Sequence, residues 1–549
     1  MSLAEPSLDQ GLIKPWMKKA VRASTRPSEN MAEAKRILAL ASPIALTGLL
    51  HYSRSLVSMI FLGRLGHLPL AGGALAIGFA NITGYSVLSG LAMGMEPLCG
   101  QAVGAHRPTL LGPALHRAVL LLLVASLPIA ALWLTMDRLL LLCGQDADVA
   151  AAAYAYVLAS LPDLIFQSFL HPIRIFLRSQ SITLPVTYAT VIAAVLHLPL
   201  NYALVFRLRL GIHGVAIASV CTNLNILLFL LLYILFADVH CPTGVLNLST
   251  DCFRGWRSLL GFAIPSVVSV CLEWWWYEIM VLLCGLLLDP KCTVASMGII
   301  IQTTSLIYIF PSSLSFSIST RVANELGADR PDRAHRAANV GLACSAVLGL
   351  LAFLFAVAVR HVWACMFTSD ATIVALTATV LPVVGACELG NCPQTVGCGV
   401  LRGSARPRVG ANINLGSFYG VGMPVATALA FWAKWDFMGL WIGMLAAQAA
   451  CVTLMLLVVR RTDWELLAQR ARQLIGGVDD AEDGAGVVLR RSQRARSGAL
   501  LVLATRRLEL LRRLQGRRGR RLLRALLLRH RSCRQDRQRQ GHRHLQRCY

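Results

Sequence analysis

Three glutamates lie within long apolar segments of the sequence. Glu273 and Glu278 occur in Cys271-Leu-Glu-Trp-Trp-Trp-Tyr-Glu-Ile279, and Glu388 occurs in Cys387-Glu-Leu-Gly-Asn-Cys-Pro393. A carboxyl group in hydrocarbon is costly, so an acid that is kept there is a candidate for function. Burial disfavours the charged carboxylate, and a proton gradient can then titrate the group. The three glutamates are therefore candidate proton-binding groups.

The spacing of these residues leaves several interpretations open. On a regular helix Glu273 and Glu278 point about 140° apart, so one can face a cleft while the other faces neighbouring helices. Helix breakers beside Glu388 could open backbone carbonyls toward a cavity. The alternative is that these acids are hydrogen-bonded to Tyr or Trp in a packed bundle. The run Trp274 to Tyr277 is typical of packing or of an interfacial belt, although an aromatic wall beside a carboxylate also suits flat organic cations.

Other titratable residues in apolar segments favour structural roles. Glu96 and Asp163 lie near predicted interfaces, where we expect pairing with one of three arginines, Arg54, Arg174 or Arg178. Isolated histidines within spans are more often satisfied structural groups than titrating ones; this group comprises His51, His171 and His197.

The elements that must carry these residues are transmembrane helices. Of 549 residues, 56% are hydrophobic and 15% charged, whereas ordinary soluble proteins have roughly 45–50% apolar and 25% charged residues. This composition excludes a soluble enzyme. Apolar segments separated by short polar clusters predict an all-α integral membrane protein with twelve transmembrane helices. The expected spans are 37–62, 70–99, 113–136, 149–172, 183–206, 212–237, 257–287, 293–319, 335–359, 371–400, 409–431 and 437–460.

Charge predicts the orientation. An even number of spans puts both termini on one side, and the short loops there hold twelve arginines against seven Lys or Arg opposite. This excess favours cytosolic termini. The net charge is +24, but residues 490–549 contain twenty arginines and no lysine and supply +18 of it. That tail could bind anionic lipid headgroups or RNA, or could result from a shifted reading frame, which we favour; we therefore expect no specific nucleic-acid partner.

An internal repeat organises the twelve spans. Pro43 matches Pro265 at a sequence offset of 222, and the loop 101–108 matches 324–331 at 223. Leu177-Arg178 matches Leu401-Arg402 at 224. Since the unit has six helices, both copies cross the membrane in the same sense, which predicts two six-helix bundles related by a pseudo-two-fold axis along the membrane normal. We divide the chain into a cytosolic tail (1–35), an N-lobe (36–237), a linker (238–256), a C-lobe (257–460) and an Arg-rich, disordered C-terminal tail (461–549).

Two facing bundles predict a transporter that works by alternating access. No GxxxxGK[ST] loop is present, so an ion gradient is the expected energy source, and we expect no cofactor. Most cysteines lie in apolar runs and read as small hydrophobes, so no metal site is predicted. One alternative is a lipid or lipid-linked precursor flippase, whose cleft would show several cations. The other is a non-transport polytopic membrane protein, such as an enzyme, whose metal or nucleophile set we do not find, or a receptor.

Several motifs resemble one family. Gly94-Met-Glu-Pro-Leu-Cys-Gly-Gln-Ala-Val-Gly-Ala105, Leu272-Glu-Trp-Trp-Trp-Tyr-Glu278 and Glu388-Leu-Gly-Asn-Cys-Pro-Gln394 are similar to the multidrug and toxic compound extrusion family, and more narrowly to its plant DETOXIFICATION branch. The resemblance covers about residues 35–475. It implies a monomeric two-lobed antiporter that exports organic solutes or xenobiotics in exchange for protons. Glu273, Glu388 and Glu278 then match the coupling acids.

The sequence departs from the family at two positions. Bacterial relatives place an acid in helix 1 where this chain has Ser58, and animal relatives often have one in helix 8 where it has Gln302. We therefore expect the second lobe alone to couple transport to protons. Candidate substrate-cavity residues are Trp274, Tyr277, Gln302, Tyr308, Asn391, Gln394 and Asn412. The expected partners are a small organic solute, protons and membrane lipid; plasma membrane and endomembrane (vacuole, Golgi or endosome) both stay open.

Overall fold

The computed structural model describes residues 15–237 and 255–476, and all regular elements among them are helices. In the first half of the chain these are α1 (Pro15–Leu65), α2 (His67–Ala80), η1 (Asn81–Tyr85), α3 (Ser86–Met93), α4 (Glu96–Gly104), η2 (Pro108–Leu110), α5 (Leu111–Trp133), α6 (Met136–Leu142), α7 (Ala147–Ser179), α8 (Leu184–Tyr202), η3 (Ala203–Arg207) and α9 (Gly211–Phe236). In the second half they are α10 (Trp256–Cys284), α11 (Pro290–Gly327), α12 (Pro331–Val359), η5 (Ala364–Met366), α13 (Ala371–Gly403), α14 (Pro407–Asn414), η6 (Leu415–Gly422), α15 (Met423–Thr427), η7 (Ala428–Trp432) and α16 (Asp436–Arg460).

Twelve helical units in the described chain are long and apolar enough to cross a membrane. They coincide with the twelve predicted spans, which are thereby confirmed. Each is longer than the roughly 20 residues that a bilayer requires, so several extend beyond the apolar core. Proline is tolerated inside many of them, as at Pro43 and Pro265, because neighbouring helices and hydroxyl side chains re-satisfy the freed backbone groups.

The backbone repeats the irregularities of the first half in the second. Residues with left-handed backbone conformations end corresponding helices: His106 and Asp329, Ser181 and Ala405, Arg209 and Lys434. The sequence numbers within these pairs differ by 223, 224 and 225, so the pairs follow the offsets found in the sequence. The π-helical segments η3 and η7 are related by the last of these offsets. The predicted duplication of a six-helix unit is therefore visible in the local geometry of the chain.

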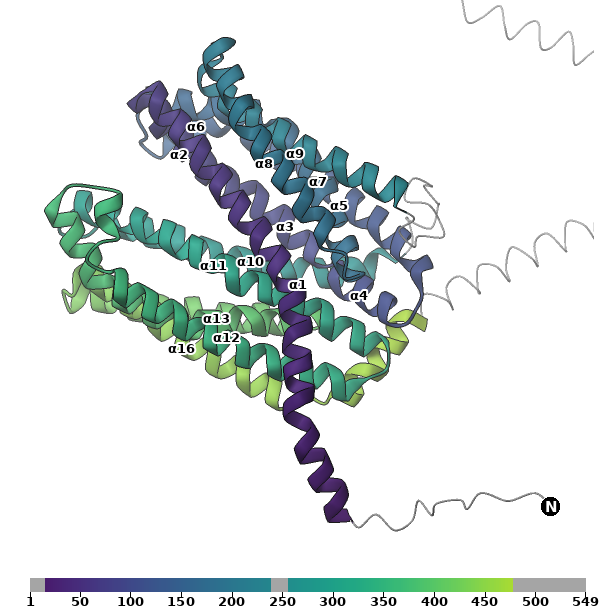
Figure 1. The fold of residues 1–549 in the computed structure, drawn as a ribbon. Helices are drawn as coiled ribbons and strands as arrows, with labels where there is room; N and C mark the ends of the chain where they lie inside the picture. Colours follow the sequence, from purple (N-terminus) through teal and green to yellow (C-terminus); the bar gives the residue numbers. More distant parts are fainter. Residues whose placement is uncertain (1–14, 238–254, 477–549) are drawn as a thin grey trace, which may run out of the picture. The chain divides into compact units, whose positions relative to one another are not determined.

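Each half has a large apolar core of its own. In the N-lobe the core includes the buried side chains of Leu122, Trp133 and Phe176. In the C-lobe it surrounds Trp276 and Trp441. Figure 1 shows the N-lobe helices in purple to blue-teal and the C-lobe helices in teal to yellow-green, with the two sets of ribbons diverging toward the ends of α2 and α6.

Helix α1 is shared between the two halves. Its first part packs on C-lobe helices, where Ile37 and Ala41 join the buried cluster that contains Ile318. Glu33 forms an ion pair with Arg321 of α11 at 2.9 Å. The second part of α1 contacts α2, α8 and α9 of the N-lobe. The helix thus begins within the expected N-terminal tail and crosses from one lobe to the other, as Figure 1 shows.

The expected C-terminal tail starts with an ordered helix. Residues 464–476 are helical, and Trp464, Leu467 and Ala471 are buried in the same cluster as Ile37. The Trp464 indole also stacks on the His335 ring at 5.3 Å. The Arg-rich segment from residue 477 onward and most of the expected linker, 238–254, lie outside the described residues.

Candidate functional site

Glu273 of α10 lines two cavities at the boundary between the lobes. The smaller has a volume of about 170 Å³ and the larger about 290 Å³. Trp274 and Tyr308 line both of them. Tyr277 and Glu278 line only the larger cavity, together with residues of η1 from the N-lobe. Glu273 and Glu278 therefore share one cavity, although they point in different directions from their helix.

Glu388 lies deeper, in the interior of the C-lobe. Its side chain is 2% exposed and is absent from the lining of the two cavities that Glu273 shares. The Asn391 amide donates a hydrogen bond to the Glu388 carboxyl at 2.9 Å, and the Cys392 thiol donates another at 3.7 Å. The Gln448 amide in turn donates to Asn391 at 3.5 Å. All of these partners are neutral.

A second chain of amides leads from Glu273. The Gln394 side chain hydrogen-bonds Glu273 and also donates to the Asn414 Oδ1 atom at 3.4 Å. The Asn414 Nδ2 atom donates to the Ser269 hydroxyl at 3.1 Å, which brings the chain back to α10. Asn414 is fully buried, so Asn414, and not Asn412 two residues earlier, belongs to this network.

Four of the predicted cavity residues line neither of the two cavities around Glu273. Asn391 and Gln394 are buried in the networks just described, and the other two are exposed. Asn412 is exposed and lines none of the described cavities around Glu273. The asparagine that the structure places near Glu273 is Asn414 instead of the predicted Asn412. Gln302 is also exposed, whereas its neighbours Ile301 and Thr304 line the larger cavity. The reason is helical geometry, since adjacent residues point about 100° apart.

The three adjacent tryptophans of α10 have different surroundings. Trp276 is fully buried and packs against the Phe418 ring at 5.6 Å. Trp274 is 39% exposed and faces the cavities. Trp275 is also exposed and donates to the Ile82 carbonyl of η1 at 3.5 Å. One tryptophan therefore serves packing, one lines the cavities and one bridges the lobes.

A buried ion-pair network joins the lobes beside the smaller cavity. Glu96 of α4 pairs with Arg178 of α7, as expected, and also with Arg402 of α13 at 3.3 Å. The Ser319 hydroxyl of α11 donates to the same carboxyl at 2.6 Å. Both guanidinium groups lie over the Phe316 ring, at 4.3 and 5.6 Å from its centre. The pairing with Arg402 was not predicted from the sequence.

The lobes approach most closely at this same end. A Cβ atom at Gly104 would lie 2.0 Å from the Asn324 carbonyl oxygen, and one at Gly327 would lie 2.1 Å from the Gln101 carbonyl oxygen. Gly104 and Gly327 correspond in the repeat, as do Gln101 and Asn324, so the contact is reciprocal. Only glycine permits such close backbone contact. The lobes are therefore closed at the end where α4, α7, α11 and α13 finish.

Polar residues of the N-lobe form a separate buried cluster. Asp163 accepts a hydrogen bond from Asn223 at 2.8 Å, and Arg54 donates to the same asparagine at 2.6 Å. Asn223 thus bridges Asp163 and Arg54, which is one of the three arginines expected near this acid. Ser58 contacts His197 at 3.0 Å. Among the described residues, no three His, Cys, Asp or Glu side chains come together in a way that could hold a metal ion.

The fold and the site together define a two-lobed, twelve-helix membrane transporter. The model of the MatE family matches residues 43–203 and 265–427, one segment in each lobe. The chain therefore belongs to the multidrug and toxic compound extrusion (MATE) family, in its plant DETOXIFICATION branch. It is a transporter and not an enzyme.

Relatives in the same branch are similar over most of the chain. Protein DETOXIFICATION 49 of Arabidopsis thaliana is 60% identical over 84% of this chain and 92% of its own length. Protein DETOXIFICATION 48 of the same plant is 58% identical over 81% of this chain and 84% of its own.

Solved structures show the same fold. The crystal structure of the eukaryotic MATE transporter AtDTX14 has a TM-score of 0.78 and 33% identity, covering 81% of this chain and 99% of that one. An outward-facing MATE transporter of the MOP superfamily has a TM-score of 0.70 at 15% identity, over 80% of this chain and 96% of that one. The latter likeness concerns the fold alone.

Proposed function

We propose that this transporter is a proton-coupled antiporter that exports organic solutes or xenobiotics from the cytosol, with Glu273, Glu388 and Glu278 as its proton-binding groups. The observation that carries this proposal is the set of neutral partners around Glu273 and Glu388. In the described part of the chain neither carboxyl forms an ion pair with Lys or Arg, and their hydrogen-bond partners are amides and a thiol. Such partners accommodate either protonation state, so a proton can bind and leave.

The position of Glu273 connects protonation to solute binding. Its carboxyl and the Trp274 ring share two cavities at the lobe boundary. A charged carboxylate attracts a cationic group on a solute, and an aromatic face adds a cation–π contact. Protonation removes the first attraction and so favours release. Three of the residues predicted to contact the substrate, Trp274, Tyr277 and Tyr308, line the larger of these cavities, which supports the proposal.

The closed end of the lobes gives the direction of this state. With both termini in the cytosol, as the loop charges indicate, the reciprocal contact of Gly104 and Gly327 seals the cytosolic side. The cavities then belong to an outward-facing state of a monomer in the plasma membrane or an endomembrane. A flippase is disfavoured because the cavities around Glu273 contain one arginine and two glutamates.

Proton-driven uptake tests this proposal. In inverted vesicles with an imposed pH difference, we expect Glu273→Gln and Glu388→Gln to lower the uptake rate by about tenfold or more. The glutamine amide cannot bind and release a proton as the carboxyl group does. Glu465→Gln, at an exposed acid, is the matched control and should transport normally. Normal pH-driven uptake by inserted Glu273→Gln contradicts the assignment, and uptake that follows an imposed Na⁺ gradient instead identifies a different coupling ion.

A further inference from the structure

Two guanidinium groups share a single carboxylate beside the smaller cavity, and one of them, Arg402, forms part of the cavity floor. Arg178 and Arg402 correspond in the repeat at an offset of 224, and both contact Glu96. The residue that corresponds to Glu96, at an offset of 223, is Ser319, which is also part of the network. The duplicated unit therefore supplies both cations but only one of the two acids. The network carries a net charge of +1.

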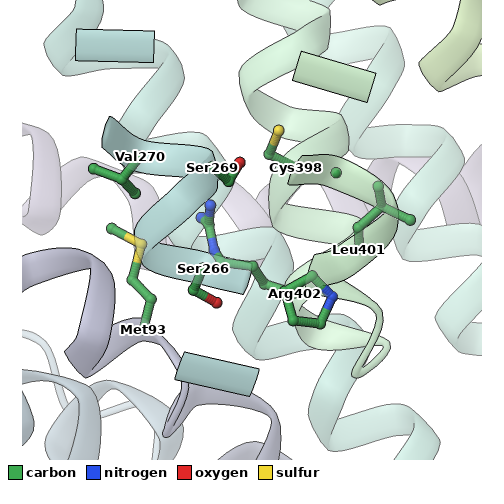
Figure 2. A pocket seen from close by; sticks show the side chains of 9 residues that line it. Met93, Ser266, Ser269, Val270, Cys398, Leu401 and Arg402 are labelled. Atoms are coloured by element: carbon green, nitrogen blue, oxygen red, sulfur yellow. The ribbon is translucent and has the colours of Figure 1, made fainter. Parts of the chain in front are cut away.

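Arg402 is the member of this network that reaches the cavities. It lines the 170 Å³ cavity together with Glu273, and it also lines a pocket of about 10 Å³ that shares Ser269 with this cavity and includes Ser266. Figure 2 shows the Arg402 side chain extending toward these two serines of α10. Its Nη2 atom donates to the Ser315 hydroxyl at 3.0 Å and its Nε atom to Glu96. The Arg402 side chain is 14% exposed.

Ser266 is a second observation that points to a ligand at this floor. The residue is 2% exposed, and its hydroxyl has no hydrogen-bond partner among the described residues. A buried hydroxyl without a partner is uncommon, because desolvation of a polar group is compensated only by a hydrogen bond. The hydroxyl and the guanidinium line the same pocket, and both can donate to one anionic oxygen.

We propose that the floor of the cavity binds the carboxylate of the transported solute through Arg402 and Ser266, and that the solute is an aromatic zwitterion. Glu96 is shared by two arginines, and in the described chain Glu273 forms no ion pair with Arg402 although both line this cavity. When Glu273 contacts the cationic part of a solute, Arg402 therefore still calls for an anion, because a buried charge is tolerated only when it is paired. Guanidinium and carboxylate groups match in geometry and form strong charge-assisted hydrogen bonds. The cationic and aromatic parts of the same solute then lie against Glu273 and Trp274, which line the same cavity.

This inference rests on the proposed function and sharpens it. Protonation of Glu273 weakens only the contact with the cationic part of the solute, while the guanidinium of Arg402 keeps its charge. The carboxylate end therefore orients the solute, and the acid on α10 controls its release. The competing explanation is that Arg402 serves only to hold the lobes together through Glu96.

A pair of probes that differ in one charge separates these explanations. The zwitterion 3-(2-naphthyl)alanine and its carboxamide have nearly the same shape, but only the first has a carboxylate. Binding of both to the full chain in lipid nanodiscs, corrected for empty nanodiscs, gives a ratio of affinities. We expect the wild type to favour the zwitterion by about tenfold or more, as befits a charge-assisted pair, and Arg402→Gln to bring the ratio close to one.

Four further variants make the result decisive. Ser266→Ala, a small change, should lower the ratio without loss of folding, and Arg402→Lys should keep part of it because the charge remains. Arg408→Gln removes an exposed arginine in the first turn of α14 and should leave the ratio of affinities unchanged. Glu96→Gln frees Arg402 from its acid and should keep the ratio or raise it.

The proposal is overturned if the wild type shows no preference for the zwitterion. It is also overturned if Arg402→Gln and Glu96→Gln weaken both probes equally, since Arg402 then acts only in the contact between the lobes. Binding needs no proton gradient, so these outcomes are independent of whether Glu273→Gln abolishes pH-driven uptake.

Discussion

His197 illustrates how hydrogen bonds hold a titratable side chain inside a membrane helix. It is 1% exposed and contacts the Ser58 hydroxyl at 3.0 Å, the Thr222 hydroxyl at 2.8 Å and the Asn201 amide at 3.0 Å. These polar groups come from three different helices of the N-lobe. The imidazole therefore satisfies several buried groups at once, which is the role that keeps such residues in apolar interiors.

We predict that His197→Leu destabilises the protein without removing the proposed proton coupling. Loss of the imidazole leaves buried hydroxyl and amide groups unpaired, at a cost of about 1–3 kcal/mol, and the apparent Tm in detergent should fall. His197→Gln, which retains hydrogen-bonding capacity, should fall less. Proton-driven uptake per folded molecule should stay near that of the wild type. Loss of uptake at an unchanged Tm would instead place a titrating group in the N-lobe.

At the residue scale the sequence indicates which acids lie in apolar segments but not all of their partners. Glu273, Glu278 and Glu388 stand out because a carboxyl group is rare in such segments. Asn412 and Asn414 are indistinguishable by type, and packing alone decides which one is buried. The pairing of Glu96 with Arg402 crosses between the lobes. The offset between Arg178 and Arg402 was the available signal, since a pseudo-two-fold axis brings corresponding residues together when they lie near it.

Among the elements, α13 begins with a capping residue outside the membrane span. The Asp370 carboxyl accepts hydrogen bonds from the Thr372 hydroxyl at 2.6 Å and from the Thr372 backbone amide at 2.8 Å. Bonds from that hydroxyl and from the first backbone amides of α13 lower the pKa of Asp370 from its ordinary value of 3.8. The cap thus binds most strongly in its charged form.

The sign of the resulting pH dependence follows from linkage. Because the pKa is lower in the folded state, the stabilising contribution of Asp370 is complete above pH 3.8 and is lost as the pH falls through the folded-state value. We predict that Asp370→Ala lowers the Tm of the purified protein at neutral pH and that this difference shrinks in acid. Asp370→Asn, which caps without titrating, should show a difference from Asp370→Ala that is independent of pH. A constant gap between wild type and Asp370→Ala contradicts the cap.

At the element scale the existence of the twelve spans is predictable because apolar length alone decides it. Their interruptions are not. The π-helical segment η1 breaks the second span at Asn81–Tyr85, in a stretch without proline, and brings Asn81 and Ile82 to the larger cavity. Such a bulge is stabilised by contacts from other helices, such as the bond that Trp133 donates to Thr83 at 2.9 Å. No local pattern in the sequence encodes that contact.

For the molecule as a whole, the helix 464–476 limits how far the chain can be shortened from its C-terminal side without loss of stability. We predict that a chain ending after residue 476 keeps the wild-type Tm and transport rate, because the buried side chains of Trp464, Leu467 and Ile475 are retained. A chain ending after residue 462 should lose on the order of 5 kcal/mol of stability, since these three apolar side chains leave the core. Thermal unfolding in detergent compares the two. Equal stabilities would mean that the helix adds nothing to the fold.

At this scale the sequence predicts the duplication but not how the two halves divide the chain. The repeat is legible because insertions are few and the offset drifts only from 222 to 225. The predicted start of the N-lobe at residue 36 does not match a boundary in the structure, because α1 starts earlier and its first part packs on the C-lobe. That packing depends on contacts between segments far apart in the sequence, such as Glu33 with Arg321, which periodicity cannot reveal.

The path of α1 has a mechanical consequence. Since one continuous helix is anchored in both halves, any motion that separates them at the sealed end must either bend α1 near Pro43 or detach its segment 29–41 from α11 and α12. A binder that holds residues 29–36 against Arg321 and Arg336 would therefore inhibit the transport cycle without altering the cavities around Glu273.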